Sequence, residues 1–112
     1  MRIRMAELGT RLLSFLAVLI FCAPALMAQG TAEATFKAKC AGCHGPDGSA
    51  STAAGKSLKI RDFHSPDVQK QTDADLSDLI SAGKGAMPAY KGKLTEDQIK
   101  QLVGYIRTFA QK

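Results

Sequence analysis

Residues 40–44 read Cys40-Ala41-Gly42-Cys43-His44 and are the most informative stretch of this 112-residue chain. In a helical turn the two thiols lie about one turn apart, so both sulfur atoms can reach one side of a flat macrocycle. Thiols placed this way add across the two vinyl groups of a haem and become thioethers, and the imidazole that follows is held against the iron. The stretch therefore predicts one haem attached through Cys40 and Cys43, with His44 as an iron ligand.

A Cys-x-x-Cys pair by itself has other interpretations. It also occurs as a thioredoxin-like redox pair, as half of a zinc site and by chance, and in an oxidising compartment two such thiols can form a structural disulfide. The adjacent His44 favours haem, because haem attachment explains all three side chains at once. A thioredoxin-like reductase would also need a βαβ pattern, which this chain lacks.

The first 28 residues have the pattern of an export signal. Three arginines precede an apolar run over residues 12–22, and small residues follow, including Ala25 and Ala28. We expect cleavage after Ala28, with cleavage after Ala25 as the alternative. The remaining residues 29–112 would then form a single haem-binding domain in the periplasm.

Two further interpretations of the N-terminus remain open. Cys22 lies at the end of the apolar run and is a candidate for lipidation, although a lipoprotein signal requires a small residue where Phe21 stands. An uncleaved signal would tether the protein to the membrane, but the apolar run is shorter than the ~20 residues that span a bilayer. We therefore expect a cleaved, periplasmic protein, with a tethered form as the alternative.

The charge balance points to protein partners rather than nucleic acid. The whole chain has a formal net charge of +5, and residues 29–112 keep +3, because three of the 15 basic and one of the 10 acidic residues precede the cleavage site. Two haem propionates would bring this value close to neutral. No basic helix with interleaved aromatic residues supports nucleic-acid binding, whereas a mildly basic surface is compatible with docking to acidic proteins.

Apolar spacing and capping residues predict a helical domain. A helix over residues 31–40 is indicated by apolar residues at i, i+4 and i+8, including Phe36 in the middle. Short helices are expected after Ser65 and Thr72, the second ending at Gly83. A longer helix begins at Thr95 with a capping box and buries one apolar face, formed by Ile99, Leu102, Val103 and Ile106.

The connecting segments are expected to be irregular. Residues 45–48 have the composition of a tight turn, residues 49–55 are small and polar and predict a loop, and residues 58–63 predict an extended segment that packs on the haem. Residues 84–90 contain Gly85 and Pro88, which exclude regular structure.

The mature chain offers two candidates for a second iron ligand. Met87 is its only methionine and lies on the Gly/Pro-containing loop between two predicted helices, where Pro88 would stiffen the loop. A methionine on a loop is ordinarily a flexible core residue, but upstream haem attachment makes it the favoured sixth ligand. His64 is the alternative, and we expect it to be a surface residue beside Ser65-Pro66.

From about residue 31 to 110 the chain resembles the small bacterial class I c-type cytochromes, of the cytochrome c6/c551-like, single-haem kind. The 40–44 motif matches the attachment site, Met87-Pro88 matches the distal-ligand loop, and Phe36 and Tyr105 fall where the family crosses its first and last helices. The resemblance implies an all-α cytochrome c fold, with three to five helices wrapped around one covalently attached haem c. It also implies His44 and Met87 as the iron ligands.

One feature departs from the family. Many relatives have a proline after the motif whose carbonyl accepts the proximal histidine N–H, and this chain has Ala53-Ala54-Gly55 in that region. We expect another backbone carbonyl there to orient His44.

These observations favour an electron carrier. With both iron positions filled by protein, one-electron exchange through the haem edge is the reaction that remains, in a periplasmic respiratory or related chain. The expected partners are a membrane oxidase, a quinol-oxidising complex or a dehydrogenase, steered by lysines near the Met87 loop. We expect no small-molecule substrate and no catalytic residues. The alternative is a haem protein with an open or displaceable sixth ligand, acting as a peroxidase-like enzyme or a gas sensor.

Overall fold

The computed structural model describes the backbone of residues 23–112 and the side chains from Thr31 onward. The basic and apolar parts of the expected export signal, with Cys22, lie outside the described residues. Among the described residues, no helix has the length and apolar character needed to cross a membrane.

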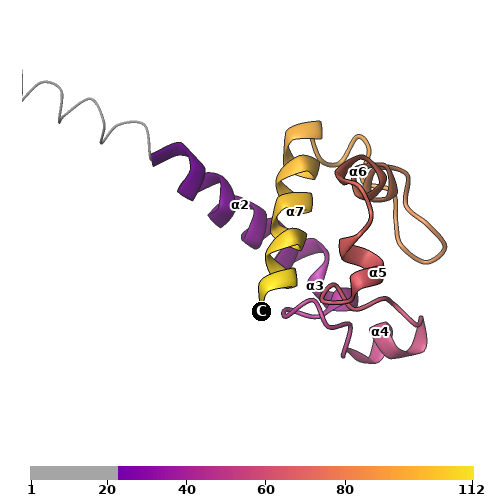
Figure 1. The fold of residues 1–112 in the computed structure, drawn as a ribbon. Helices are drawn as coiled ribbons and strands as arrows, with labels where there is room; N and C mark the ends of the chain where they lie inside the picture. Colours follow the sequence, from indigo (N-terminus) through magenta and orange to yellow (C-terminus); the bar gives the residue numbers. More distant parts are fainter. Residues whose placement is uncertain (1–22) are drawn as a thin grey trace, which may run out of the picture.

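The described chain is helical, as predicted, and contains no β-strand among residues 23–112. Three helices carry the fold: α2 (Ala23–Lys39), α6 (Asp73–Ala82) and α7 (Glu96–Thr108). Short helical segments connect them: α3 (Ala41–His44), α4 (Ala53–Ser57), α5 (Pro66–Gln69) and, after α7, the 3-10 turn η1 (Phe109–Gln111). Figure 1 shows α7 crossing α2, with the short helices α3–α5 grouped towards the C-terminal end of α7.

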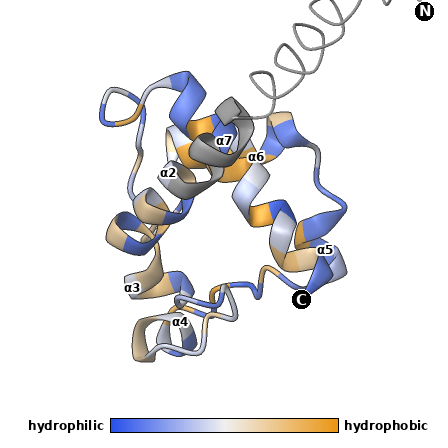
Figure 2. Cartoon of the chain, turned by 90° about the vertical axis from the view of Figure 1, so that its left-hand side faces the viewer, coloured by the Kyte–Doolittle hydropathy of each residue, from blue (hydrophilic) through white to orange (hydrophobic). Residues whose placement is uncertain are grey.

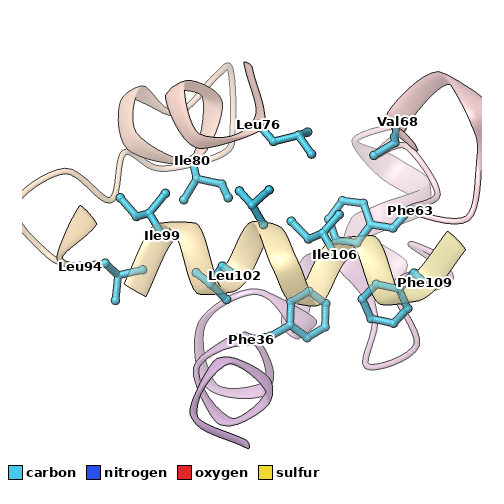
Figure 3. Packing of buried hydrophobic residues seen from close by; sticks show 11 residues of the cluster. Phe36, Phe63, Val68, Leu76, Ile80, Leu94, Ile99, Leu102, Ile106 and Phe109 are labelled. Carbon is cyan, nitrogen blue, oxygen red and sulfur yellow. The ribbon is translucent and has the colours of Figure 1, made fainter. Parts of the chain in front are cut away.

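The core lies on both sides of α7. Phe36 from α2 packs on one side, and Leu76 and Ile80 from α6 pack on the other (Figure 3). The predicted crossing of the first and last helices is confirmed, because the rings of Phe36 and Tyr105 lie 5.2 Å apart. Figure 2 shows both hydrophobic and hydrophilic residues on α6, and the hydrophobic ones Leu76 and Ile80 are buried, as expected for a helix with one buried face.

Helices α6 and α7 both begin with a capping box, as predicted for the helix that starts at Thr95. The Thr72 hydroxyl accepts from the Asp75 N–H at 3.0 Å, and the Asp75 carboxylate accepts from the Thr72 N–H at 3.2 Å. Thr95 and Gln98 make the equivalent pair at 3.1 and 2.9 Å. These bonds satisfy backbone donors that a helix start leaves free, so the starts of α6 and α7 follow from local sequence.

Helix α4 is a difference from the expected loop. The Thr52 hydroxyl accepts from the Gly55 N–H at 2.9 Å and also donates to the Cys43 carbonyl at 2.8 Å. This second bond connects the helix start to the residue before His44. A small, polar composition predicted a loop, but a capping threonine fixed by a tertiary contact is enough to form one helical turn.

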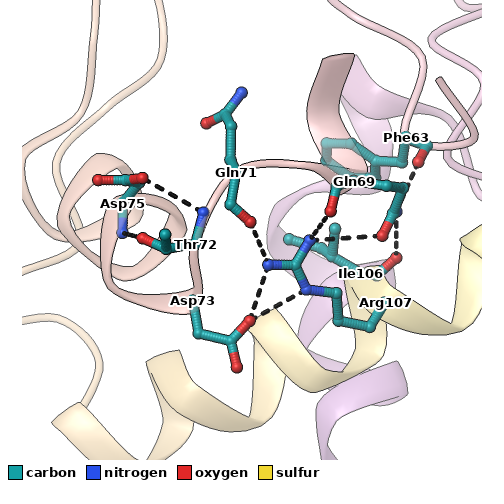
Figure 4. Close-up of polar contacts among 8 residues, drawn as sticks. All are labelled: Phe63, Gln69, Gln71, Thr72, Asp73, Asp75, Ile106 and Arg107. Carbon is teal, nitrogen blue, oxygen red and sulfur yellow. Dashed lines mark hydrogen bonds and ion pairs between the residues drawn. The ribbon is translucent and has the colours of Figure 1, made fainter. Parts of the chain in front are cut away.

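Arg107 joins the end of α7 to the segment between α5 and α6 (Figure 4). Its guanidinium donates to the Gln69 carbonyl at 2.8 Å, to the Gln71 carbonyl, and to the Asp73 carboxylate at 3.0 and 2.8 Å. The Gln69 amide in turn donates to the carbonyls of Phe63 and Ile106, at 2.7 and 3.1 Å. This network holds the chain around Phe63 against α7.

Candidate haem-binding site

An apolar cavity lies between α2, α3, α6 and α7. Its empty volume is about 480 Å³, part of which is open to solvent. The lining combines three of the four predicted site residues, Cys40, His44 and Met87, with apolar and aromatic side chains: Phe36, Phe63, Leu76, Leu79, Ile80, Tyr90, Leu102 and Ile106. The fold thus gathers residues from five separate parts of the sequence around one apolar space.

The attachment motif forms a single helical turn. The Cys43 and His44 N–H groups both donate to the Cys40 carbonyl, at 3.2 and 2.9 Å. Cys40 is half-buried at the cavity and Cys43 is exposed, and the two are not joined by a disulfide. Burial raises the pKa of the Cys40 thiol. The structure therefore supports the helical geometry expected for the motif, although Cys43 does not itself line the cavity.

His44 is held by its backbone and by a ring contact. Its carbonyl accepts from the Ala50 N–H at 2.7 Å, and its imidazole stacks on Phe63 with centroids 4.6 Å apart. Burial lowers the pKa of His44 and so favours the neutral ring, which is the form that ligates a metal. The Nδ1 atom is buried without a hydrogen-bond partner among the described residues. The expected backbone carbonyl therefore does not orient this ring.

Gly55 allows α4 to lie directly behind the motif. A Cβ atom on this residue would stand 2.2 Å from the Ala50 carbonyl oxygen and 2.8 Å from that of Cys43. Any side chain here would push α4 away from the turn that carries His44. The sequence contains ten glycines, and nothing in its local pattern distinguishes this one, because the close approach is tertiary.

The Met87 loop leaves α6 through a turn that also requires glycine. Gly83 has φ +69°, and a Cβ atom there would lie 2.6 Å from the Met87 carbonyl oxygen. Lys84 and Met87 exchange backbone hydrogen bonds of 3.1 and 3.0 Å. This tight turn positions the half-buried Met87 side chain at the cavity, while Pro88 is exposed.

His64 lies away from the cavity lining. Its Nδ1 atom pairs with the Asp62 carboxylate at 2.6 Å, and its backbone N–H donates to the same oxygen at 2.8 Å. The expected surface position is consistent with this contact to an exposed aspartate, although the ring also contacts Phe109 edge-on, with centroids 5.6 Å apart.

The residues present fit a haem. The cavity is apolar, as a macrocycle requires, and it is bordered by a thiol, a neutral imidazole and a thioether. By contrast, no group of three or more His, Cys, Asp or Glu side chains gathers anywhere in the described part of the chain, so the zinc half-site has no further protein ligands there.

Comparison with known proteins agrees with this chemistry. Residues 28–106 match the family described as cytochrome C oxidase, cbb3-type, subunit III. The chain belongs to the small class I c-type cytochromes. Its cofactor is accordingly haem c, bound covalently, and this cytochrome is an electron-transfer protein rather than an enzyme.

Individual relatives support the same family. Cytochrome c6 of Leptolyngbya boryana is 38% identical over 77 residues, which cover 69% of this chain and 87% of the relative. Cytochrome c6 of Nostoc sp. is 35% identical over 100 residues, or 88% and 84% of the two chains. Among solved structures, the KustC0563 c-type cytochrome matches with a TM-score of 0.65 at 32% identity, covering 70% of this cytochrome and 95% of the other.

Proposed function

We propose that this cytochrome is a one-electron carrier whose haem is attached to Cys40 and Cys43 and ligated by His44 and Met87. The observation that carries the proposal is that His44 and Met87, from separate elements, line one apolar cavity together with Cys40. Each side chain is anchored independently, His44 by the motif turn and Met87 by the Gly83 turn.

The haem supplies a centre that gains and loses one electron. The chain's part would be to hold the iron through the His44 imidazole and the Met87 thioether and to exclude water from the apolar pocket. An imidazole and a thioether as ligands would favour the reduced form and raise the potential. With both side chains bound, a small substrate would have no free metal position to occupy.

We place the carrier in the periplasm, exported by residues 1–28, in a respiratory or related electron-transfer chain. The family description names a subunit of a cytochrome c oxidase, which supports an oxidase as the electron acceptor. A quinol-oxidising complex or a dehydrogenase is the corresponding type of donor.

The surface near the Met87 loop suits an acidic partner. Lys84, Lys91 and Lys93 are all exposed, and none of them makes an ion pair within the described residues. Unpaired lysines beside the haem pocket increase the rate of encounter with acidic surfaces, and this effect decreases as salt is added.

The deciding experiment replaces Met87 with Ala. Because Cys40, Cys43 and His44 are untouched, the haem should stay attached, while the far-red band of sulfur–iron coordination disappears. Carbon monoxide should bind the ferrous form readily, and the midpoint potential should fall. Leu79→Ala is the matched control, because Leu79 also lines the cavity but carries no ligating atom. A parent-like spectrum and potential in Met87→Ala would show that Met87 only packs.

A further inference from the structure

The Met87 loop, residues 83–94, is fastened to α6 by its backbone. The Tyr90 N–H donates to the Ile80 carbonyl and the Lys91 N–H to the Ser81 carbonyl, both at 3.1 Å. These bonds place the loop relative to α6 only. Cys40 and His44 belong to the α2–α3 segment, so the span between Met87 and His44 depends on what joins the loop to that segment.

A single side-chain hydrogen bond makes this connection. The Tyr90 hydroxyl donates to the Lys39 carbonyl at 3.0 Å, across 51 positions of sequence. Among the hydrogen bonds and ion pairs of residues 31–112, no other joins the Met87 loop to α2 or α3. The acceptor of this hydrogen bond, Lys39, immediately precedes Cys40.

The Lys39 carbonyl is available because α2 ends there. In a continuing helix it would accept from the Cys43 N–H, but that group donates to Cys40 instead. The last carbonyls of a helix lack intrahelical partners and need another donor. No backbone N–H of the described chain supplies one to Lys39, and the phenol of Tyr90 does.

The ring of Tyr90 also forms part of the cavity wall, beside His44 and Met87. We propose that Tyr90 is a positioning residue for the Met87 sulfur. Its hydroxyl joins the Met87 loop to the end of α2 by a hydrogen bond and so holds Met87 at a fixed distance from His44. This role rests on the proposed ligation of iron by Met87. It makes the loop's opening, and hence the exchange of the sixth ligand, depend on one phenolic hydrogen bond.

Tyr90→Phe tests this role because it removes the hydroxyl and keeps the ring in the cavity wall. Losing one hydrogen bond should increase the population of the opened loop by a factor of roughly two to ten. Carbon monoxide competes with Met87 for the sixth position, so its binding to the ferrous holoprotein should accelerate by a similar factor. The ferric far-red band should weaken, and amide exchange at Lys84 and Met87 should accelerate.

Tyr105→Phe is the matched control. Tyr105 is also half-buried, but its hydroxyl makes no hydrogen bond among the described residues, so its removal should leave all three measurements unchanged. Unchanged carbon monoxide binding, band and loop exchange in Tyr90→Phe would overturn the positioning role, even if the melting temperature fell. Met87→Ala separates the two proposals. If the far-red band is retained in Met87→Ala, Met87 does not ligate the iron and both proposals are overturned. If the band is lost in Met87→Ala while Tyr90→Phe matches the parent in all three measurements, only the role of Tyr90 is overturned.

Discussion

The imidazole of His44 stacks on the ring of Phe63, with centroids 4.6 Å apart and an interplanar angle of 21°. The Nδ1 atom of His44 has no hydrogen-bond partner within residues 31–112, so no hydrogen bond at that atom orients the ring, whereas the stack on Phe63 does restrict it. Phe63 is itself held by its N–H, which donates to the Gly48 carbonyl at 2.9 Å, and by its carbonyl, which accepts from Gln69. The orientation of His44, the proposed iron ligand, is thus connected to the Arg107 network.

Phe63→Leu should increase the mobility of the His44 imidazole. The smaller side chain should lower the free energy of unfolding by about 1–2 kcal/mol. It should also change the visible spectrum and the midpoint potential, because the imidazole loses its stacking partner. Phe109→Leu is the control: Phe109 packs against Phe63 but makes no ring contact with His44. If both variants shift the midpoint potential equally, stacking on Phe63 does not determine the orientation of the His44 imidazole.

Replacing the attachment cysteines should remove the haem and much of the fold. Cys40→Ser and Cys43→Ser should each cripple covalent attachment, and the double variant should leave a largely unfolded chain. The physical reason is that this small domain encloses an apolar cavity, which has too few packing partners when no haem fills it. Circular dichroism during thermal unfolding is the measurement. A haem-free double variant with a cooperative melt would contradict the expectation.

His64→Ala should leave the spectrum and midpoint potential nearly unchanged. The His64 imidazole pairs with the Asp62 carboxylate at a partly exposed site, and such surface pairs contribute less than about 1 kcal/mol. The backbone hydrogen bond to Asp62 lowers the pKa of that carboxyl and does not depend on the imidazole. Loss of the low-spin spectrum on this change would identify His64 as the ligand.

Gly83→Ala should disturb the Met87 loop more than Gly85→Ala does. Both glycines have positive φ, of 69° and 57°, which strains any other residue, and Gly83, with ψ of 173°, lies in a region that essentially only glycine adopts. Only at Gly83 would the new methyl group also meet backbone, at 2.6–2.8 Å, whereas nothing lies within 4 Å of it at Gly85. We expect the far-red band to weaken in Gly83→Ala alone. Equal bands in the two variants would show that the close approach does not position Met87.

The features that could be predicted from the sequence are those that depend on residues close together in the chain. The 40–44 motif, the Thr72 and Thr95 capping boxes and the apolar face of α7 each lie within one or two helical turns, so neighbouring residues alone specify them. The Met87 loop was recognisable from its glycine and proline. Helix α4 was not, because its capping threonine also needs the Cys43 carbonyl nine residues away.

By itself, the sequence determined the cofactor chemistry and the helical class, since both depend on residue type and short-range spacing. Tertiary structure alone decided that Tyr90 reaches Lys39, that Gly55 lies against the motif, that Arg107 holds the segment before α6, and that His44 is oriented by stacking. These contacts join residues up to 51 positions apart. Hydrophobic periodicity shows which face of a helix is buried, but which side chains meet across a crossing depends on how the helices pack in three dimensions.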